Sequence, residues 1–235
     1  MIMKKIGIIG GLGPEATILY YKEMADQYKI RSGGVDPEII IYSISLVEFK
    51  KYMDEKDLSS AIGLLSRAVD SIVKAGADFV SIAANTPHIV FDEVNRNSKV
   101  PIISIVEETA KSADMISKNR KVGLMGTGFT MKSDFYPKSF RKYGLEVFTP
   151  DKKDQDYIHE KIFSELTNGV VAEKTKEKFL EIVQSLIETH AVDSLVLGCT
   201  ELPLIFDQDY FGIHYLDTVK IHVESIINFS LKDKR

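Results

Sequence analysis

Short runs of apolar residues alternate along the whole chain with longer segments in which apolar residues recur with the period of a helix. This alternation predicts strands joined by crossover helices, as in a parallel sheet. Most strand segments are apolar throughout, as expected for strands covered on both faces. Strands are predicted at Lys5 to Ile9, Ile39 to Ser43, Phe79 to Ala83, Pro101 to Ile105, Val122 to Met125, Glu146 to Phe148, Ser194 to Leu197 and Ile213 to Leu216. Helices are predicted at Pro14 to Tyr28, Leu58 to Lys74, Pro87 to Asn97, Glu107 to Lys118, Met131 to Tyr143, Tyr157 to Asn168, Glu173 to Thr189 and Thr218 to Leu231, with helix stops at Gly76 and Gly169.

The pattern of the first half of the chain returns in the second half. The sequence from Lys5 to Gly10 resembles that from Lys121 to Gly126, and the sequence from Asp78 to Asn85 resembles that from Asp193 to Thr200. The offset is 116 residues for the first pair, 115 for the second and 113 for a third pair near Ser104 and Asp217. An offset held almost constant over three strands predicts two similar α/β halves that face each other across a cleft. Ligands of such sheets bind outside the carboxyl ends of the strands.

Composition narrows the class of protein. The chain has 235 residues, of which 44% are hydrophobic and 27% are charged, so it can bury a core and is neither disordered nor a disulfide scaffold. A single cysteine, Cys199, can form neither an intramolecular disulfide nor a thiolate metal cage. We therefore expect an intracellular protein.

Charge and hydropathy argue against two classes of partner. The formal charge is −4, and basic residues are mixed with acidic ones, so nucleic acid is not an expected ligand. No run approaches the roughly 18 consecutive apolar residues of a membrane helix. Lys4 and Lys5 followed by Ile6 to Leu12 look like the start of a signal peptide, but the apolar run is short and no small-residue cleavage site follows. We expect a soluble, cytoplasmic protein with no membrane partner.

Two glycine-containing turns follow predicted strands at matching places in the halves. Gly11 to Ala16 fits the G-x-G-x-x-A dinucleotide fingerprint, but Tyr42-Ser43 stand where the ribose-binding acid should lie. A turn that presents backbone N–H groups to a small anion is the favoured interpretation, and a tight turn without a ligand is the alternative. In the second half, Gly126 to Thr130 adds two threonine hydroxyls near a helix start and suits a carboxylate or phosphate.

The single thiol lies at a predicted strand end. Cys199 is followed by Thr200, Glu201 and, two residues later, Pro203, which can begin a helix whose N-terminus would favour the thiolate. A buried cysteine is more often a small hydrophobic residue than a catalytic one. The polar neighbours and the repeat nevertheless favour a role in chemistry.

The corresponding loop of the first half is Ala83 to His88. Alignment on Asp78 and Asp193 places Ala84 opposite Cys199, because each lies six residues further on. Asn85 and Thr86 are neutral donors suited to a ligand carboxylate. His88 is either an acid or base, or a packed or capping histidine. Similarly, Tyr157, His159, Glu160 and Lys161 either reach the cleft or form a solvated helix face.

Together these residues resemble the cofactor-independent aspartate/glutamate racemase family, in its aspartate racemase branch. The resemblance rests on Ile6 to Thr17 (IGIIGGLGPEAT), Ala84 to His88 (ANTPH) and Gly198 to Pro203 (GCTELP), and it covers essentially the whole chain. It implies an α/β fold of two pseudo-symmetric three-layer domains with mainly parallel four-stranded sheets, a site in the cleft between them, no cofactor, no metal and a homodimer. We place the first domain at residues 1–105 with a C-terminal helix at about 218–235, and the second at residues 106–217.

Inversion of an α-carbon requires that one group remove the proton from one face and another return a proton to the opposite face. Two facing cysteines do this in the family, but the first of them is Ala84 here, so Cys199 is the remaining thiol. Thr86, His88 or water would serve the other face. The resemblance also implies a substrate-binding set of Leu12, Ala84, Asn85, Thr86, Thr127, Thr130, Lys161, Thr200 and Glu201, with Lys161 replacing a basic residue that reads the side-chain carboxylate in relatives.

Three functions are compatible with this pattern. The first is a racemase acting on a small dicarboxylic amino acid such as aspartate or glutamate, slow or one-sided because Ala84 carries no proton. The second is a decarboxylase of malonate-type acids, since arylmalonate decarboxylases of the wider superfamily need a single cysteine. The third is a catalytically impaired paralogue that binds an acidic metabolite.

Overall fold

The computed structural model describes residues 3–232 of the chain, which form two compact units. Within this range unit 1 comprises residues 3–105 and 219–232, and unit 2 comprises residues 106–218. Residues 1–2 and 233–235, which the predicted first domain includes, lie outside the described residues. Among the described residues, none of the helices combines the length and the apolar character needed to span a membrane.

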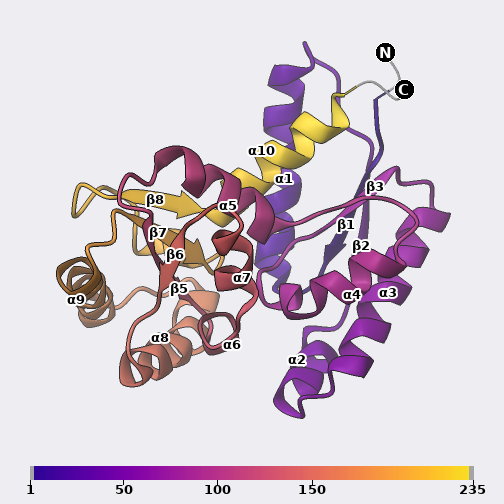
Figure 1. Ribbon diagram of the computed structural model, residues 1–235. Coiled ribbons are helices and arrows are strands. Elements are labelled where there is room, and N and C mark those ends of the chain that lie inside the picture. The colour runs from indigo at the N-terminus through magenta and orange to yellow at the C-terminus, as the bar shows by residue number, and fades with distance from the viewer. Residues whose placement is uncertain (1–2, 233–235) are drawn as a thin grey trace. The chain divides into compact units, whose positions relative to one another are not determined.

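Unit 1 contains a four-stranded parallel sheet in the order β2-β1-β3-β4, of which Figure 1 labels β1, β2 and β3. Its strands are β1 (Ile6–Gly10), β2 (Ile39–Ser43), β3 (Phe79–Ile82) and β4 (Ile102–Ile103). Its helices are α1 (Pro14–Arg31), α2 (Leu46–Asp54), α3 (Leu58–Lys74), the 3₁₀ helix η1 (Thr86–Val90), α4 (Phe91–Asn97) and α10 (Thr218–Ser230).

Successive residues of β1 face opposite sides of this sheet. Ile6 and Ile8 belong to a buried cluster with apolar residues of α1 and α10. On the other side, a Cβ added to Gly7 would lie 2.3 Å from a side-chain atom of Ile72 in α3. The absence of a side chain at Gly7 thus lets α3 lie close to the sheet, while α1 and the C-terminal helix α10 cover the first face.

Unit 2 repeats this topology with a parallel sheet in the order β6-β5-β7-β8. Its strands are β5 (Lys121–Gly126), β6 (Glu146–Phe148), β7 (Ser194–Gly198) and β8 (His214–Asp217). Its helices are α6 (Gly128–Met131), α7 (Phe135–Arg141), α8 (Lys152–Ser164), η2 (Leu166–Asn168), α9 (Glu173–His190) and η3 (Leu202–Leu204); α5 (Ile105–Ile116) begins at the boundary of the units.

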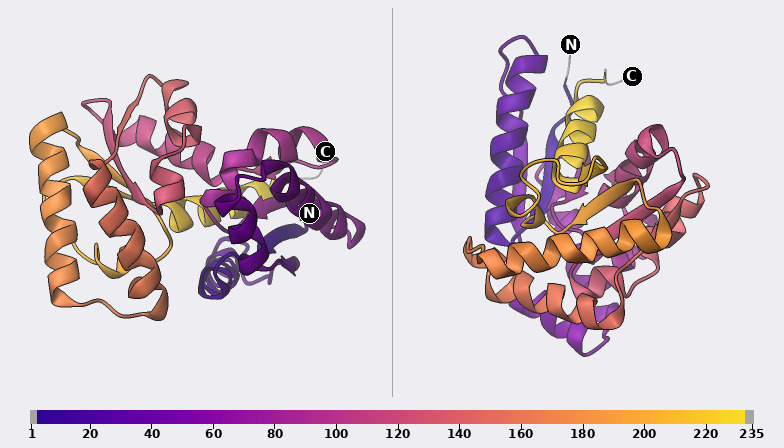
Figure 2. Two further views of the ribbon diagram at one scale, coloured as in Figure 1. Left: turned by 90° about the horizontal axis from the view of Figure 1, so that it is seen from below. Right: turned by 90° about the vertical axis from the view of Figure 1, so that its left-hand side faces the viewer.

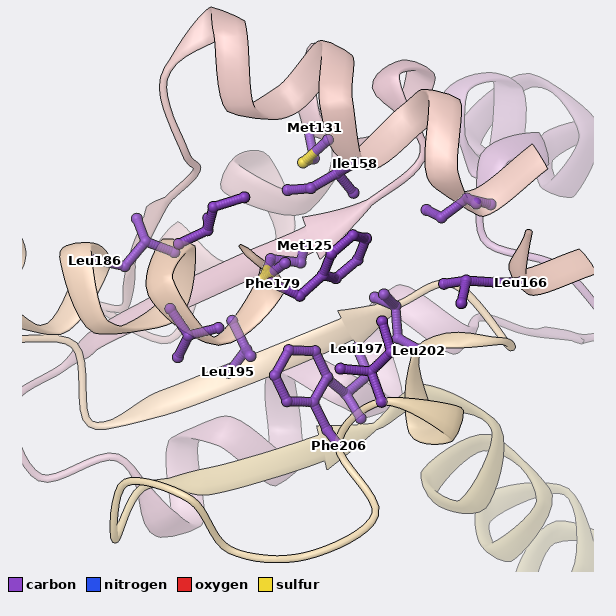
Figure 3. Close-up of a cluster of buried hydrophobic side chains, with 14 of the residues drawn as sticks. Met125, Met131, Ile158, Leu166, Phe179, Leu186, Leu195, Leu197, Leu202 and Phe206 are labelled. Atoms are coloured by element: carbon purple, nitrogen blue, oxygen red, sulfur yellow. The ribbon is translucent and has the colours of Figure 1, made fainter. Parts of the chain in front are cut away.

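A cluster of buried side chains joins α8 and α9 to this sheet. Phe179 of α9 is fully buried among residues that include Met125, Ile158 and Leu197 (Figure 3). Figure 2 shows α8 and α9 beside each other along the same part of unit 2, in agreement with their contacts. Burial of one such aromatic side chain contributes about 2–3 kcal/mol, so the two helices have a fixed position against β5 and β7.

The predicted strands all exist, and Ile39–Ser43 and Glu146–Phe148 have the predicted bounds. The expectation of strands covered on both faces is wrong for β2, where Ile41 and Tyr42 are each about 40% exposed. Helix α3 has the predicted bounds, and it is followed by Gly76 with a φ of 99°. The C-cap of η2 is Gly169, with a φ of 70°.

Three of the predicted helices are wrong in detail. The segment from Pro87 to Asn97 is a 3₁₀ turn followed by α4. In the segment from Met131 to Tyr143, Met131 is the last residue of α6 and the helix α7 spans only Phe135–Arg141. The helix predicted to begin at Tyr157 begins at Lys152 and ends at Ser164, before a separate 3₁₀ turn. Helix α2 was not predicted.

Candidate active site

Strands β5 and β7 both end in a glycine. Gly126 and Gly198 are partners in the sheet register. A Cβ on Gly126 would lie 2.9 Å from the carbonyl oxygen of Gly198, and a Cβ on Gly198 would lie 2.8 Å from that of Met125. Because only glycine permits this approach, the loops that begin at Thr127 and Cys199 start side by side at the carboxyl edge of the sheet.

Cys199 is half-buried and its thiol has a defined partner. Its Sγ donates a hydrogen bond to Glu201 Oε2 at a separation of 2.8 Å. Burial of the thiol raises its pKa well above the usual range, and the negative charge and hydrogen bond of Glu201 raise it further. The thiol is therefore protonated at neutral pH.

This protonation state corrects the sequence prediction of a thiolate stabilised by a helix end. The segment containing Pro203 is only the three-residue turn Leu202–Leu204. Backbone N–H groups at Thr200 and Glu201 do favour the thiolate, but desolvation and the Glu201 carboxylate outweigh them. The neighbouring carboxylate, rather than a helix dipole, sets the state of this thiol.

The turn after β5 is built from two buried threonines. Thr127 is the N-cap of α6, and its Oγ1 accepts the backbone N–H of Thr130. The two hydroxyls are 3.2 Å apart, and Thr130 is fully buried. Thr127 and Thr130 thus lie at the same sheet edge as Cys199, as the repeat predicts.

Lys161 lies on α8 and is engaged by acidic neighbours. Its Nζ is 2.9 Å from Glu165 Oε1, and it stands 5.7 Å above the ring of Tyr157. Its hydrogen bond to Glu165 raises its pKa, and Glu165 in turn accepts the hydroxyl of Thr175. Lys161 is a cation in an ordered network, and its role toward a substrate carboxylate stays a prediction.

In unit 1, the N–H group of Gly11, in the turn after β1, donates a hydrogen bond within the protein. Gly11 has a φ of 83°, and its N–H donates to Thr17 Oγ1 at 2.9 Å. The same hydroxyl donates to the carbonyl oxygen of Gly13 at 3.2 Å. The expectation that this turn offers its N–H groups to an anion is therefore wrong for Gly11. Leu12, between the two glycines, is partly exposed.

Ala84 occupies the place in unit 1 that Cys199 occupies in unit 2. Ile6 pairs with Phe79 in the first sheet and Val122 pairs with Ser194 in the second. Ala84 and Cys199 each lie five residues beyond the second member of their pair. The methyl group and the thiol are therefore equivalent in their own units. Asn85 is buried, and Thr86, which is partly exposed, begins η1.

His88 is a buried, neutral imidazole. Its Nδ1 lies 3.1 Å from the carbonyl oxygen of Ala84, so Nδ1 carries the proton, and its ring stacks on Phe91. Burial lowers the pKa of His88 to about 3, and the nearby His222 lowers it as well. Among the described residues its Nε2 has no hydrogen-bond partner. The neutral ring holds its one proton on Nδ1 toward the Ala84 carbonyl oxygen, and such an N–H is too weak an acid to protonate a substrate at neutral pH.

A second buried histidine, which the sequence analysis did not single out, lies in the same unit. His222 Nε2 is 3.0 Å from the carbonyl oxygen of Ile103, and its Nδ1 is 2.8 Å from Tyr20 Oη. The carbonyl requires a donor, so Nε2 carries the proton and Nδ1 accepts from the tyrosine. No sequence signal marked this pair, because its members are 202 residues apart.

Three comparisons place the chain among known proteins. The model of the family "Asp/Glu/Hydantoin racemase" matches residues 9–226. The chain belongs to the Asp/Glu/hydantoin racemase family.

Relatives of this racemase-family chain match it over nearly its whole length. A structure of an aspartate racemase homologue from Pyrococcus horikoshii OT3 is 36% identical, with a TM-score of 0.82 over 97% of this chain and 99% of the other. The aspartate racemase of Picrophilus torridus is 25% identical, with a TM-score of 0.72 over 98% and 96%. The broad specificity amino-acid racemase RacX of Bacillus subtilis is 26% identical over 235 residues, covering 95% and 96%. The resemblance to this family is confirmed, as are the α/β fold and the two parallel sheets.

Within the racemase fold, the predicted site residues form one group in each unit. Thr127, Thr130, Cys199, Thr200 and Glu201 follow β5 and β7 at the carboxyl edge of the second sheet, and Lys161 lies on α8. Leu12, Ala84, Asn85, Thr86 and His88 follow β1 and β3 in the first sheet, where Ala83 N donates to Ile9 O. Among residues 3–232, no cluster of three or more His, Cys, Asp or Glu could hold a metal ion.

Proposed function

We propose that this family member is a cofactor-independent amino-acid racemase for a small dicarboxylate such as aspartate or glutamate. The observation that carries the proposal is the pair formed by Cys199 and Glu201 at the end of β7. Its thiol is protonated and next to a base, which suits a group that must give a proton to a carbanion and later take one back. The racemase relatives, which match almost the whole chain, support the reaction class.

The proposed chemistry assigns one face of the α-carbon to Cys199. A planar carbanion accepts the proton of the thiol and leaves a thiolate, whose charge lies beside the Glu201 carboxylate. Repulsion between these two charges makes the thiolate a strong base, which favours abstraction of a proton in the reverse direction. Thr200, Thr127 and Asn85 would bind the α-carboxylate, with Thr130 behind Thr127.

The opposite face lacks a thiol because of Ala84. Thr86, His88 or a water molecule is the predicted substitute. His88, being neutral and buried, cannot itself protonate the carbanion at neutral pH. We expect slow turnover and a preference for one enantiomer as substrate.

Deuterium uptake tests the proposal directly. Each enantiomer of aspartate, glutamate and a broad amino-acid panel is incubated with the protein in heavy water, and the label at the α-carbon and the enantiomer ratio are measured. Wild-type protein should incorporate deuterium, and Cys199→Ser should lose most of this activity, while Glu177→Gln on the exposed face of α9 serves as the control. Absence of exchange from every amino acid, in either enantiomer, would contradict the proposal.

A measurement of thermal stability beside the deuterium experiment identifies an impaired paralogue. Thermal stabilisation by aspartate or glutamate without exchange would show that the chain binds an acidic metabolite and does not turn it over. The proposed partners are otherwise limited to this small molecule and a second copy of the chain, a homodimer that light scattering on the purified protein would detect.

The protonation state of Cys199 favours a second candidate function. A decarboxylase of malonate-type acids creates its carbanion by loss of carbon dioxide and needs only one acid to protonate it. A thiol whose pKa is raised by burial and by Glu201 is protonated in the resting state, as this reaction requires. Release of carbon dioxide from substituted malonates, abolished in Cys199→Ser, would establish it; no release would exclude it.

A further inference from the structure

Helix α8 holds both ends of the short helix α6 that follows β5. At the start of α6, the backbone N–H of Gly128 donates to His159 Nδ1 at 3.0 Å. At its end, Lys132 Nζ lies 2.6 Å from Asp156 Oδ1. Asp156 and His159 are three residues apart, so they lie on the same face of α8. The turn that carries Thr127 is therefore anchored from outside the sheet.

The two anchors differ in strength. Both side chains of the pair between Lys132 and Asp156 are about half exposed, and an exposed ion pair contributes little to the stability of a turn. His159, by contrast, is half-buried and has edge contacts to Phe129 and Phe163, at centroid distances of 5.7 and 5.0 Å. The ring is clamped, so its hydrogen bond to Gly128 is the stronger constraint.

Gly128 approaches this ring closely. A Cβ added to Gly128 would lie 3.4 Å from Cγ and Nδ1 of His159, in van der Waals contact with the ring. The backbone N–H is a donor only, so Nδ1 must accept, and the proton of the neutral imidazole is on Nε2. The first N–H groups of a helix have no acceptor within the helix. In α6, the N–H of Gly128 donates to the His159 ring, and the N–H of Thr130 donates to the Thr127 hydroxyl.

We propose that His159 is a positioning residue that fixes the turn from Thr127 to Thr130 through the N–H of Gly128, so that the Thr127 hydroxyl is presented to the substrate. The inference rests on the proposed function for the substrate that the turn serves. If His159 acted only by packing, its aromatic ring would be needed and its acceptor atom Nδ1 would not. The two roles are separable because two substitutions each keep one of these properties.

His159→Asn keeps an acceptor, since Oδ1 stands where Nδ1 stood, and loses the ring. His159→Phe keeps the ring between Phe129 and Phe163 and loses the acceptor. Lys153→Gln, at an exposed position of the same helix, is the control. Each protein is examined by hydrogen exchange of the Gly128 amide and by the KM and kcat of α-proton exchange.

Loss of one hydrogen bond of this kind corresponds to about a five- to tenfold effect. In His159→Phe we expect Gly128 amide exchange and KM to rise by this factor, with kcat changed less than about twofold; His159→Asn and Lys153→Gln should resemble the wild type. Equal protection of Gly128 in His159→Phe and wild type, or equal defects in the Asn and Phe variants, would overturn the proposal.

Two further outcomes are distinguishable. Nitrogen NMR of the wild-type protein should show an unprotonated His159 Nδ1 and a protonated Nε2, which needs no variant to fold; the opposite tautomer would refute the hydrogen bond. If the wild-type protein exchanges no α-proton, the proposed function fails, and the protection of Gly128 across the variants still decides whether His159 holds the turn.

Discussion

At the scale of single residues, the state of Cys199 is decided by Glu201, two positions further along the chain. The resemblance to relatives assigned Glu201 to substrate binding, whereas the structure places its carboxylate 2.8 Å from the thiol. The sequence shows both residues but not this contact, because a turn between them can direct the carboxylate toward the thiol or away from it. The protonation state of Cys199 therefore follows from the positions of the two side chains and not from the residue types alone.

Replacement of Glu201 should acidify the thiol. In Glu201→Gln the negative charge beside Sγ is removed, so the pKa of Cys199 should fall and the thiolate fraction at pH 8 should rise. Because Cys199 is the single cysteine of the chain, the pH dependence of whole-protein alkylation measures this directly. Glu177→Gln should leave the alkylation rate unchanged, and an unchanged rate in Glu201→Gln would show that the carboxylate does not set the pKa.

Restoration of the missing thiol should change the ratio of the racemisation rates from the two enantiomers. Ala84→Cys supplies a proton carrier at the position equivalent to Cys199, so we expect at least a tenfold rise in the slower direction of racemisation, in line with the contribution of one acid or base. The rates from the L and D enantiomers are measured separately. Ala83→Cys, one residue earlier and fully buried, should give no gain; an equal gain in both variants would argue against a site at position 84.

At the scale of elements, the strands were predictable because buried parallel strands are short, continuous apolar runs. The missed helix α2 carried a signal nonetheless, since Ser45 and Glu48 have the spacing of a capping box, and Ser45 Oγ accepts the N–H of Glu48. Similarly, Asp151 caps α8 through the N–H of Asp154. The division between α6 and α7 follows from Pro137, which has no N–H to donate and therefore lies in the first turn of α7.

Replacement of glycine by alanine should have opposite effects on stability at Gly198 in β7 and at Gly63 in α3. Gly198→Ala places a methyl group 2.8 Å from the carbonyl oxygen of Met125, so it should destabilise unit 2 by about 1–3 kcal/mol. Gly63→Ala lies within α3, where the nearest atom is the end of Arg67 at 3.4 Å, and should stabilise unit 1 by about 0.5–1 kcal/mol. Denaturant unfolding of the two variants checks both signs, and a neutral Gly198→Ala would show that β5 and β7 can separate.

At the scale of the whole molecule, the buried His88 should make stability depend on pH. Its pKa is about 3 in the folded chain, against about 6.5 in the unfolded chain. The unfolded chain therefore binds the extra proton as the pH falls below about 6.5, and stability should fall by about 1.4 kcal/mol per pH unit toward pH 3. His88→Gln should flatten this dependence between pH 6.5 and 5, measured by urea unfolding, whereas His214→Gln, at the exposed first residue of β8, should not. Parallel wild-type and His88→Gln curves would contradict the assignment.

The path of the chain through the two units has a consequence for its synthesis. Unit 1 begins the chain, yet its sheet is covered by α10, and the N–H of Lys4 donates to the carbonyl oxygen of Ser230. On the ribosome, α1 can cover only part of the apolar face of β1 and β3. The part that packs against α10 stays uncovered until more than 100 further residues have been made, while unit 2 is continuous and can close its core first. The half of the protein that is translated first is the half that finishes folding last, and during this interval the part of its apolar face that α10 will cover is exposed to chaperones and to other nascent chains.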